Sequence, residues 1–188
     1  METPAERHRL FFALLPDERV LDDIMRVASL LKSTYHPRGK WMPVDMLHMT
    51  LIFLGDFPAL ASDAVVVHAL SSGDDVSMPG FELTLDSASS FSGRRPPWVL
   101  RGDKSREALM PFWRALGTAL ATGGFRTPPE ADFVPHVTVL RDADKPLDGF
   151  EIKPIRWQVR DFALMHSRMG KEREYVVLRR WSLDKAPA

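Results

Sequence analysis

Two short motifs of the same form constrain this chain more than any other feature of its sequence. His48-Met49-Thr50-Leu51 and His136-Val137-Thr138-Val139 lie 88 residues apart in a chain of 188. Each motif follows an apolar segment, a helical pattern and a Pro-containing loop at nearly the same distance, 32 residues after Pro16 and 34 after Gly102. Self-similarity of this kind is typical of an internally duplicated supersecondary unit, here strand–helix–strand.

The order of the expected elements predicts one α+β domain over residues 1–188. Strands and helices lack the strict βα alternation of a parallel sheet, and no linker separates the two halves. We therefore expect two duplicated lobes, each with an antiparallel sheet and helices, around a central groove. Apolar patterning predicts strands at Arg9–Leu15, Met46–Leu54, Gly80–Ser87, Trp98–Arg101 and Phe133–Arg141, and a closing hairpin of Trp157–Ser167 and Glu174–Trp181. It predicts helices at Glu18–Lys32, Ala59–Leu70 and Ser105–Thr122, and loops at Tyr35–Lys40 and Ser89–Pro97.

Composition limits the compartment and the partners. The chain has 25 Lys plus Arg and 25 Asp plus Glu, so we expect no large nonspecific attraction to nucleic acid. This balance does not exclude a local basic cleft. The absence of cysteine excludes disulfides, thiolate zinc sites and a cysteine nucleophile, and fits a reducing compartment. The apolar run that ends at Pro16 is too short for a signal peptide or a membrane span. We expect a cytoplasmic monomer that does not enter membranes.

The two motifs carry the residues that phosphodiester chemistry needs. Side chains alternate along a strand, so His48 and Thr50 share one face, and His136 and Thr138 share the equivalent face. Histidine titrates near neutral pH and can deprotonate a water or protonate a leaving oxygen. The Thr hydroxyls can donate hydrogen bonds to phosphate oxygens. The spacing lacks the His-x-His, His-x₃-His or carboxylate patterns of metal ligands, so we expect neither a metal nor a cofactor.

The paired motifs and their flanks resemble a known family. The chain is similar to the 2H phosphoesterase superfamily and, more closely, to the RNA 2′,3′-cyclic phosphodiesterases, also called 2′–5′ RNA ligases. The resemblance runs nearly from end to end through Arg9–Pro16, Trp41–Gly55, Pro135–Arg141 and Tyr175–Leu183. One His-x-Thr-x motif alone would be weak support, whereas two at this spacing and in these flanks are specific.

The resemblance assigns roles to five residues. It implies that His48 and His136 form the catalytic pair, that Thr50 and Thr138 bind the phosphate, and that Arg141 contacts the phosphate as well. On a straight strand Arg141 would face away from His136, so the strand must bend or end there.

The chain departs from the family pattern at position 52. A lysine is common there in the family, and Ile52 replaces it, which puts the substrate preference in question.

The resemblance also implies the reaction. Water activated by His136 attacks a 2′,3′-cyclic phosphate end, and the 3′-oxygen leaves with a proton from His48, which gives a 2′-phosphomonoester. The reverse reaction would join a 5′-hydroxyl to the cyclic phosphate through a 2′–5′ linkage. Two alternatives stay open: a small cyclic nucleotide or 2′–5′ oligonucleotide as substrate, decided by the loops Ser33–Lys40 and Ser89–Pro97, and a non-catalytic module that binds RNA ends.

Other residues carry weaker signals. Arg94 and Arg95 could contact an RNA backbone or simply form a charged turn. Trp41 and Phe91 could stack on a base or pack in the core, whereas for Phe53 we expect core packing. The remaining histidines have no matching context, and we assign no catalytic role to His8, His36, His68 and His166.

Overall fold

The computed structural model describes residues 7–58, 63–102, 105–169 and 174–183. The strands are β1 (Arg7–Leu14), β2 (Lys40–Trp41), β3 (Met49–Pro58), β4 (Phe81–Ser90), β5 (Trp98–Arg101), β6 (His136–Arg141), β7 (Phe150–Val159), β8 (Asp161–Met169) and β9 (Glu174–Ser182). The helices are α1 (Glu18–Tyr35), α2 (Asp63–Asp74) and α3 (Arg106–Thr122), with 3₁₀ turns at Val44–Met46 and Glu130–Asp132. No helix in these ranges is both long and apolar enough to cross a membrane.

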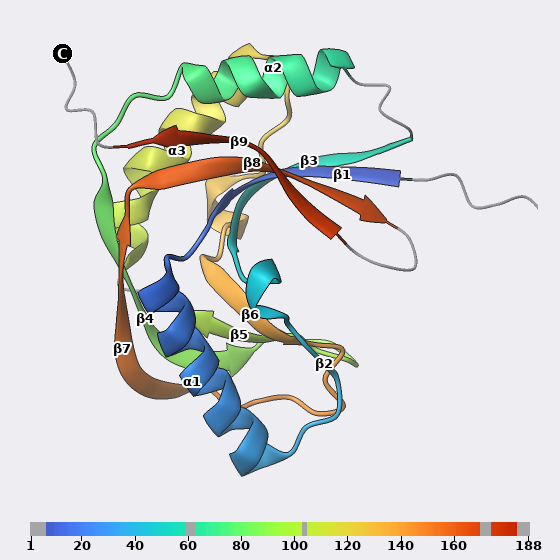
Figure 1. Ribbon diagram of the computed structural model, residues 1–188, viewed down its shortest axis with the longest axis vertical. Helices are drawn as coiled ribbons and strands as arrows, with labels where there is room; N and C mark the ends of the chain where they lie inside the picture. Colours follow the sequence, from blue (N-terminus) through green and yellow to red (C-terminus); the bar gives the residue numbers. More distant parts are fainter. Residues whose placement is uncertain (1–6, 59–62, 103–104, 170–173, 184–188) are drawn as a thin grey trace, which may run out of the picture.

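The strands form two groups that meet at the motif strands. Their order is β7-β4-β5-β6-β3-β1-β8-β9, with β2 on β6, and all recorded pairs are antiparallel. We call β3, β1, β8 and β9 the first lobe, and β7, β4, β5, β6 and β2 the second lobe (Figure 1). The groups join through one residue pair, Met49 with Val137. The expected α+β fold with two lobes is confirmed.

The chain exchanges elements between the lobes, which the duplication in sequence did not predict. Helix α1 follows a strand of the first lobe but packs on β7 of the second, while α2 packs on β8 and β9 of the first lobe and on α3 (Figure 1). The predicted closing hairpin is confirmed, because β8 pairs antiparallel with β9. The predicted start of its first strand at Trp157 is wrong, because the chain passes from one lobe to the other at Arg160, between β7 and β8. The sequence has no Gly or Pro at this crossing, so the boundary was not visible in it.

Most other boundaries shift by a few residues. The strand predicted from Met46 begins at Met49, and the one predicted from Phe133 begins at His136, because a 3₁₀ turn occupies the chain before each. Strand β4 extends through Ser90 into the predicted loop. Helix α2 runs four residues beyond the predicted Leu70, while the start of that prediction lies outside the described residues.

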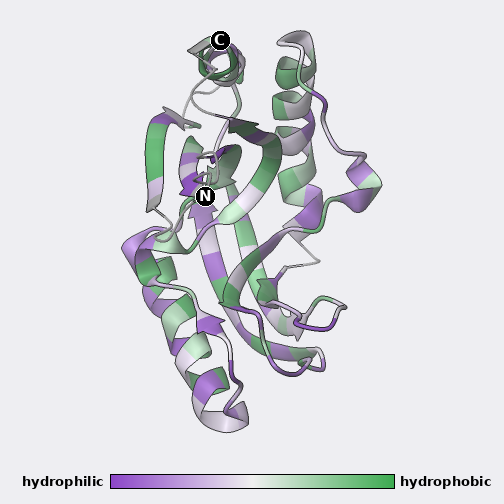
Figure 2. Ribbon diagram, turned by 90° about the vertical axis from the view of Figure 1, so that its right-hand side faces the viewer, coloured by the Kyte–Doolittle hydropathy of each residue, from purple (hydrophilic) through white to green (hydrophobic). Residues whose placement is uncertain are grey.

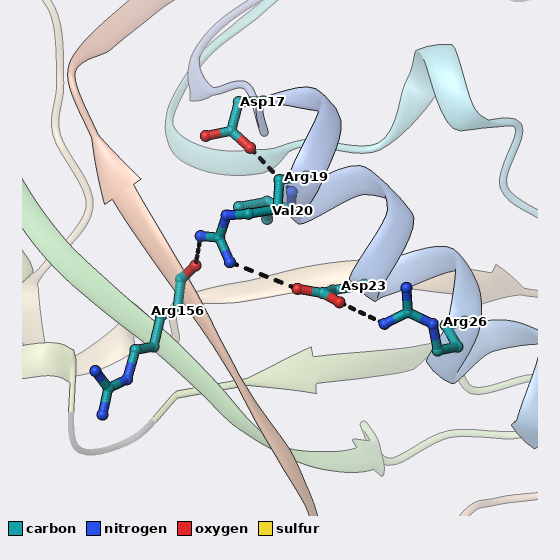
Figure 3. A network of polar contacts seen from close by, with 6 residues as sticks. All are labelled: Asp17, Arg19, Val20, Asp23, Arg26 and Arg156. Atoms are coloured by element: carbon teal, nitrogen blue, oxygen red, sulfur yellow. Dashed lines mark hydrogen bonds and ion pairs between the residues drawn. The ribbon is translucent and has the colours of Figure 1, made fainter.

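Helix α1 begins with a side-chain cap from the residue before it and packs on the second lobe. The Asp17 side chain accepts a hydrogen bond from the Val20 amide at 2.9 Å, which satisfies one of the free amides of the first turn. The Arg19 guanidinium donates to the carbonyl of Arg156 on β7 and pairs with Asp23 (Figure 3). The apolar stripe of the helix faces the core through Val20, Ile24, Ala28 and Leu31. Apolar and polar residues therefore lie on different faces of this helix (Figure 2).

A row of apolar side chains crosses the junction between the lobes. Met49 and Val137 pair with each other, and they pair in turn with Leu14 on β1 and Leu100 on β5. Paired residues in a sheet share a face, and all four side chains are buried in one core. The apolar faces of the two motif strands therefore hold the lobes together, which leaves their opposite faces available for the polar residues.

Truncation within this row should be costly. Leu100 is 0% exposed at the junction, and Leu30 on α1 is 63% exposed, so Leu100→Ala and Leu30→Ala compare the same deletion in two environments. We expect Leu100→Ala to lower the free energy of unfolding by about 2–5 kcal/mol and Leu30→Ala to change it by less than about 0.5 kcal/mol. Urea unfolding followed by circular dichroism measures both. Equal effects would show that the junction adds little to stability.

Candidate active site

The register of the two motif strands brings the four motif side chains together. Met49 and Val137 are direct partners in an antiparallel pair, and His48 and Thr50 flank the first of them, as His136 and Thr138 flank the second. These side chains point away from the core, because alternation puts them on the face opposite the buried Met49 and Val137. The two histidines and the two threonines therefore lie together on one face of the junction.

The same residues line a small cleft of about 160 Å³. Its walls are formed by Met42, Met46, His48, Thr50, His136, Thr138 and Arg141. All five residues that the sequence analysis singled out are in this set, although they come from two strands 88 residues apart. A cleft of this size can hold a phosphate group with two imidazoles, two hydroxyls and a guanidinium around it.

Both histidines have a fixed tautomer. His48 Nδ1 lies 2.8 Å from the carbonyl of Met46, and His136 Nδ1 lies 2.7 Å from the carbonyl of Val134. A carbonyl can only accept a hydrogen bond, so each Nδ1 must carry a proton and donate it. In the neutral ring Nε2 then has a free lone pair, and it can take up a proton and later release it. In both motifs the accepting carbonyl belongs to the residue two positions earlier in the chain.

The surroundings of the cleft favour neutral imidazoles. Burial lowers the pKa of His48 to about 4, although the Met46 carbonyl opposes this, and the positive charge of Arg141 and the nearby His136 lower it further. Burial also lowers the pKa of His136, with a smaller contribution from Arg101. A cleft that disfavours positive charge on its histidines while holding arginines nearby is suited to an anion.

A β-bulge in β6 brings Arg141 into the cleft. Trp98 pairs with Leu140, but the next residue of β5, Val99, pairs with Thr138, so Val139 is an extra residue on β6. Val139 and Leu140 are consequently both buried, and Arg141 returns to the face of His136 and Thr138. The bend that the sequence analysis required is this bulge. Arg141 is also held from the first lobe, because its guanidinium donates to the Tyr175 hydroxyl at 3.1 Å.

The same bulge occurs in the first motif strand. Phe12 pairs with Ile52 and Ala13 with Thr50, so Leu51 is the extra residue of β3. Ile52 is therefore buried, 1% exposed, and lies in the core away from the cleft, so a side chain at this position does not reach the candidate phosphate site. The next residue, Phe53, is 46% exposed, so the expectation that it packs in the core is wrong.

Sequence reasoning missed three residues around the histidines. The rings of Phe11 and Tyr175 lie 5.1 Å and 5.2 Å from the His48 ring, measured between centroids, and Arg101 is the strand partner of His136. None belongs to a motif, although Arg9–Pro16 and Tyr175–Leu183 were already noted as family-like segments. For Phe91 the sequence allowed either stacking on a base or packing in the core. Its ring lies 4.8 Å from that of His136, measured between centroids.

The other residues considered in the sequence lie outside the cleft. Trp41 packs edge-on against Trp98, with 6.4 Å between the ring centroids, and Arg94 and Arg95 are exposed. His8 and His166 are buried together, with Nδ1 of the first 2.7 Å from Nε2 of the second. Within the described ranges no group of three or more His, Cys, Asp or Glu residues is arranged as metal ligands are.

Comparison with known proteins places the chain in a family. The family model described as the 2′-5′ RNA ligase superfamily matches residues 16–171. The RNA 2′,3′-cyclic phosphodiesterase of Escherichia coli K12 is 31% identical, over 96% of this chain and 99% of that protein. The protein of the same name from Methanothermobacter thermautotrophicus is 32% identical, over 71% of this chain and 70% of its own.

Solved structures agree with this assignment. The crystal structure of E. coli LigT in apo form has a TM-score of 0.74 and 28% identity, and the match covers 96% of this chain and 99% of that one. A protein of Thermus thermophilus, TT0787, at 24% identity and a TM-score of 0.72 over 94% of this chain and 98% of its own, has the same fold. With a matching family model over most of its length and a full-length relative above 30% identity, the chain belongs to the 2′-5′ RNA ligase superfamily.

Proposed function

We propose that this protein is an RNA 2′,3′-cyclic phosphodiesterase that opens 2′,3′-cyclic phosphate ends to 2′-phosphomonoesters. The observation that carries the proposal is the pair of imidazoles, each with Nδ1 fixed by a carbonyl, in one cleft with two threonines and Arg141. The two relatives named RNA 2′,3′-cyclic phosphodiesterase supply the substrate class. A structure of E. coli LigT with 3′-AMP supports a nucleotide ligand.

In the proposed mechanism the two histidines act on opposite sides of phosphorus. His136 Nε2 takes a proton from water as the water oxygen forms a bond to phosphorus. The bond from phosphorus to the 3′-oxygen breaks, and this oxygen receives the Nε2 proton of His48. The Thr50 and Thr138 hydroxyls and the Arg141 guanidinium stabilise the negative charge on the non-bridging oxygens. No divalent ion is needed, since side chains supply both proton transfers and the charge stabilisation.

The assignment of acid and base follows the family resemblance, because the pseudo-symmetry of the cleft allows either direction. The reverse reaction uses the same groups: a 5′-hydroxyl replaces water and a 2′–5′ linkage forms. A non-catalytic module is less well supported, because binding alone does not require two imidazoles with fixed tautomers. We also propose that the chain acts as a single domain and a monomer in the cytoplasm, in keeping with its lack of cysteine.

Loss of either imidazole should abolish most of the turnover. We expect His48→Ala and His136→Ala each to lower kcat on a 2′,3′-cyclic-ended oligonucleotide by roughly 10²- to 10⁴-fold, with much smaller effects on binding of 2′-AMP. The double variant should be only slightly worse than the worse single one, because both groups act in one transition state. Assays in EDTA test the metal-free mechanism at the same time. His68→Ala, at an exposed histidine of α2, is the control. Near-normal turnover in either cleft variant would exclude that histidine as acid or base.

The titration of His48 should depend on whether the cleft holds a phosphate. The pKa of about 4 makes this imidazole neutral at pH 7 in the empty cleft. An anionic phosphate beside the ring favours its protonated form, so bound 2′-AMP should raise the pKa of His48 and thereby enable it to act as an acid. NMR titration with and without 2′-AMP measures the change, and His48→Gln assigns the resonance. An unchanged pKa under saturating 2′-AMP would contradict the placement of phosphate against this ring.

The regiochemistry tests the substrate orientation. The 2′- and 3′-oxygens are chemically too similar for their acidity to select the leaving group, so the orientation of the ribose must decide. We expect the 3′-oxygen to face His48 and the product to be the 2′-phosphate. Chromatography against 2′- and 3′-nucleotide standards distinguishes the two products. A predominant 3′-phosphate would keep the two-histidine chemistry but reverse the orientation of the ribose in the cleft.

A further inference from the structure

Strand β2 extends the cleft face of the second lobe beyond Arg141. Lys40 on β2 is the direct strand partner of Arg141, so the two side chains share a face of the sheet (Figure 1). The Met42 amide donates to the carbonyl of Val139, so the chain stays extended along β6 for two more residues. Met42 lines the cleft, and alternation along an extended chain puts Lys40 on the same face as Met42. Both relations place the Lys40 side chain beside Arg141, at the mouth of the cleft.

A second cation reaches the same place from the loop between β4 and β5. The exposed Arg95 donates to the carbonyl of Asp142, the residue after Arg141, at 3.5 Å. A guanidinium has several N–H donors, so this contact leaves others for a ligand. The Lys40 ammonium group lies 3.7 Å from the Asp142 carboxylate, and these side chains are 80% and 46% exposed. An ion pair this exposed contributes little and rearranges readily, so Lys40 can bind another anion. We call Lys40 and Arg95 the basic rim of the cleft.

The basic rim lies at the end of the cleft next to His48. The Tyr175 hydroxyl accepts a hydrogen bond from Arg141 at 3.1 Å, and its ring lies 5.2 Å from that of His48, measured between centroids. The Arg141 guanidinium and the His48 imidazole are thus on either side of one tyrosine. The strand pairing of Lys40 with Arg141 continues this row away from the imidazole.

The connectivity of ribose then gives the direction of a bound RNA end. In the proposed reaction the 3′-oxygen faces His48. The carbon that carries this oxygen is bonded to C4′, which carries the 5′-carbon and hence the rest of an RNA chain, whereas the base is attached on the side of the 2′-oxygen. A nucleotide whose 3′-oxygen faces His48 therefore directs its 5′ side toward Arg141 and the basic rim.

We propose that Lys40 and Arg95 bind the phosphodiester on the 5′ side of the nucleotide whose cyclic phosphate lies between the two histidines. The inference rests on the proposed function and narrows its substrate class to the end of an oligonucleotide, in preference to a free cyclic mononucleotide. The Cα atoms of Lys40 and Arg141 are about 5 Å apart in their antiparallel pair, and both side chains are long enough to reach phosphates on either side of one ribose. Contacts to phosphate carry no base information, so the rim binds an RNA chain of any sequence.

The test compares two substrates that differ only at the 5′-oxygen. One is adenosine 2′,3′-cyclic phosphate, and the other carries a methyl phosphodiester on its 5′-oxygen, which has the single charge of an RNA linkage. The readout is kcat/KM for the second substrate divided by kcat/KM for the first. We expect this ratio to exceed one in the wild-type protein and to fall as salt is raised, because the rim is exposed to solvent. Lys40→Ala and Arg95→Ala should each lower the ratio by roughly 2- to 10-fold, and Lys40→Arg, which keeps the charge, should retain it.

A matched control and two further outcomes delimit the proposal. Lys153→Ala removes an exposed lysine of β7 outside the cleft and should leave the ratio unchanged. A wild-type ratio of one, or an unchanged ratio in either Lys40→Ala or Arg95→Ala, would overturn the proposal while the two-histidine chemistry stands. A wild-type protein that turns over neither substrate would instead contradict the proposed function.

Discussion

The antiparallel contact between β3 and β6 is the constraint on which the rest of the structure depends. A single recorded pair, Met49 with Val137, joins the two lobes, and both side chains point into the common core. Burial of this apolar face stabilises the junction, and alternation along the strands then requires His48 and His136 to lie on the opposite face. Packing and site geometry are thus two consequences of one register. A shift of one residue in either strand would put its histidine into the core.

Each motif strand also relies on an irregularity. Without the bulge at Val139, Arg141 would point to the buried face, where an unpaired guanidinium is costly. The equivalent bulge at Leu51 buries Ile52 and exposes Phe53. The duplicated strands therefore share a β-bulge, but the residue that this bulge directs is Arg141 in β6 and Phe53 in β3. Each motif contributes an imidazole and a hydroxyl to the cleft, whereas the residue that follows the bulge is an arginine of the cleft in β6 and an exposed phenylalanine in β3.

The surroundings of the histidines complete this arrangement. Carbonyls two residues earlier orient both rings, and Tyr175, from a strand late in the chain, contacts both the ring of His48 and the guanidinium of Arg141. Low accessibility and nearby positive charge disfavour the protonated imidazole until an anion arrives. If the proposed function is right, a bound phosphate would have the opposite effect and favour the protonated form of His48.

The sequence by itself determined the duplication, the α+β class and the four motif residues that line the cleft, because motif spacing and strand alternation are local properties. Arg141 was expected there only from the family resemblance, since alternation alone would turn it away. It did not determine which strands and helices share a lobe. The crossing at Arg160 lacks a turn residue, and the packing of α1 on β7 depends on surfaces far apart in the chain. Nor did it reveal Tyr175 beside His48 or the exposure of Phe53, since a ring in an apolar strand reads as core. Tertiary structure decided these points, because bulges and long-range strand pairing set the direction of a side chain and leave no periodic signal in the sequence.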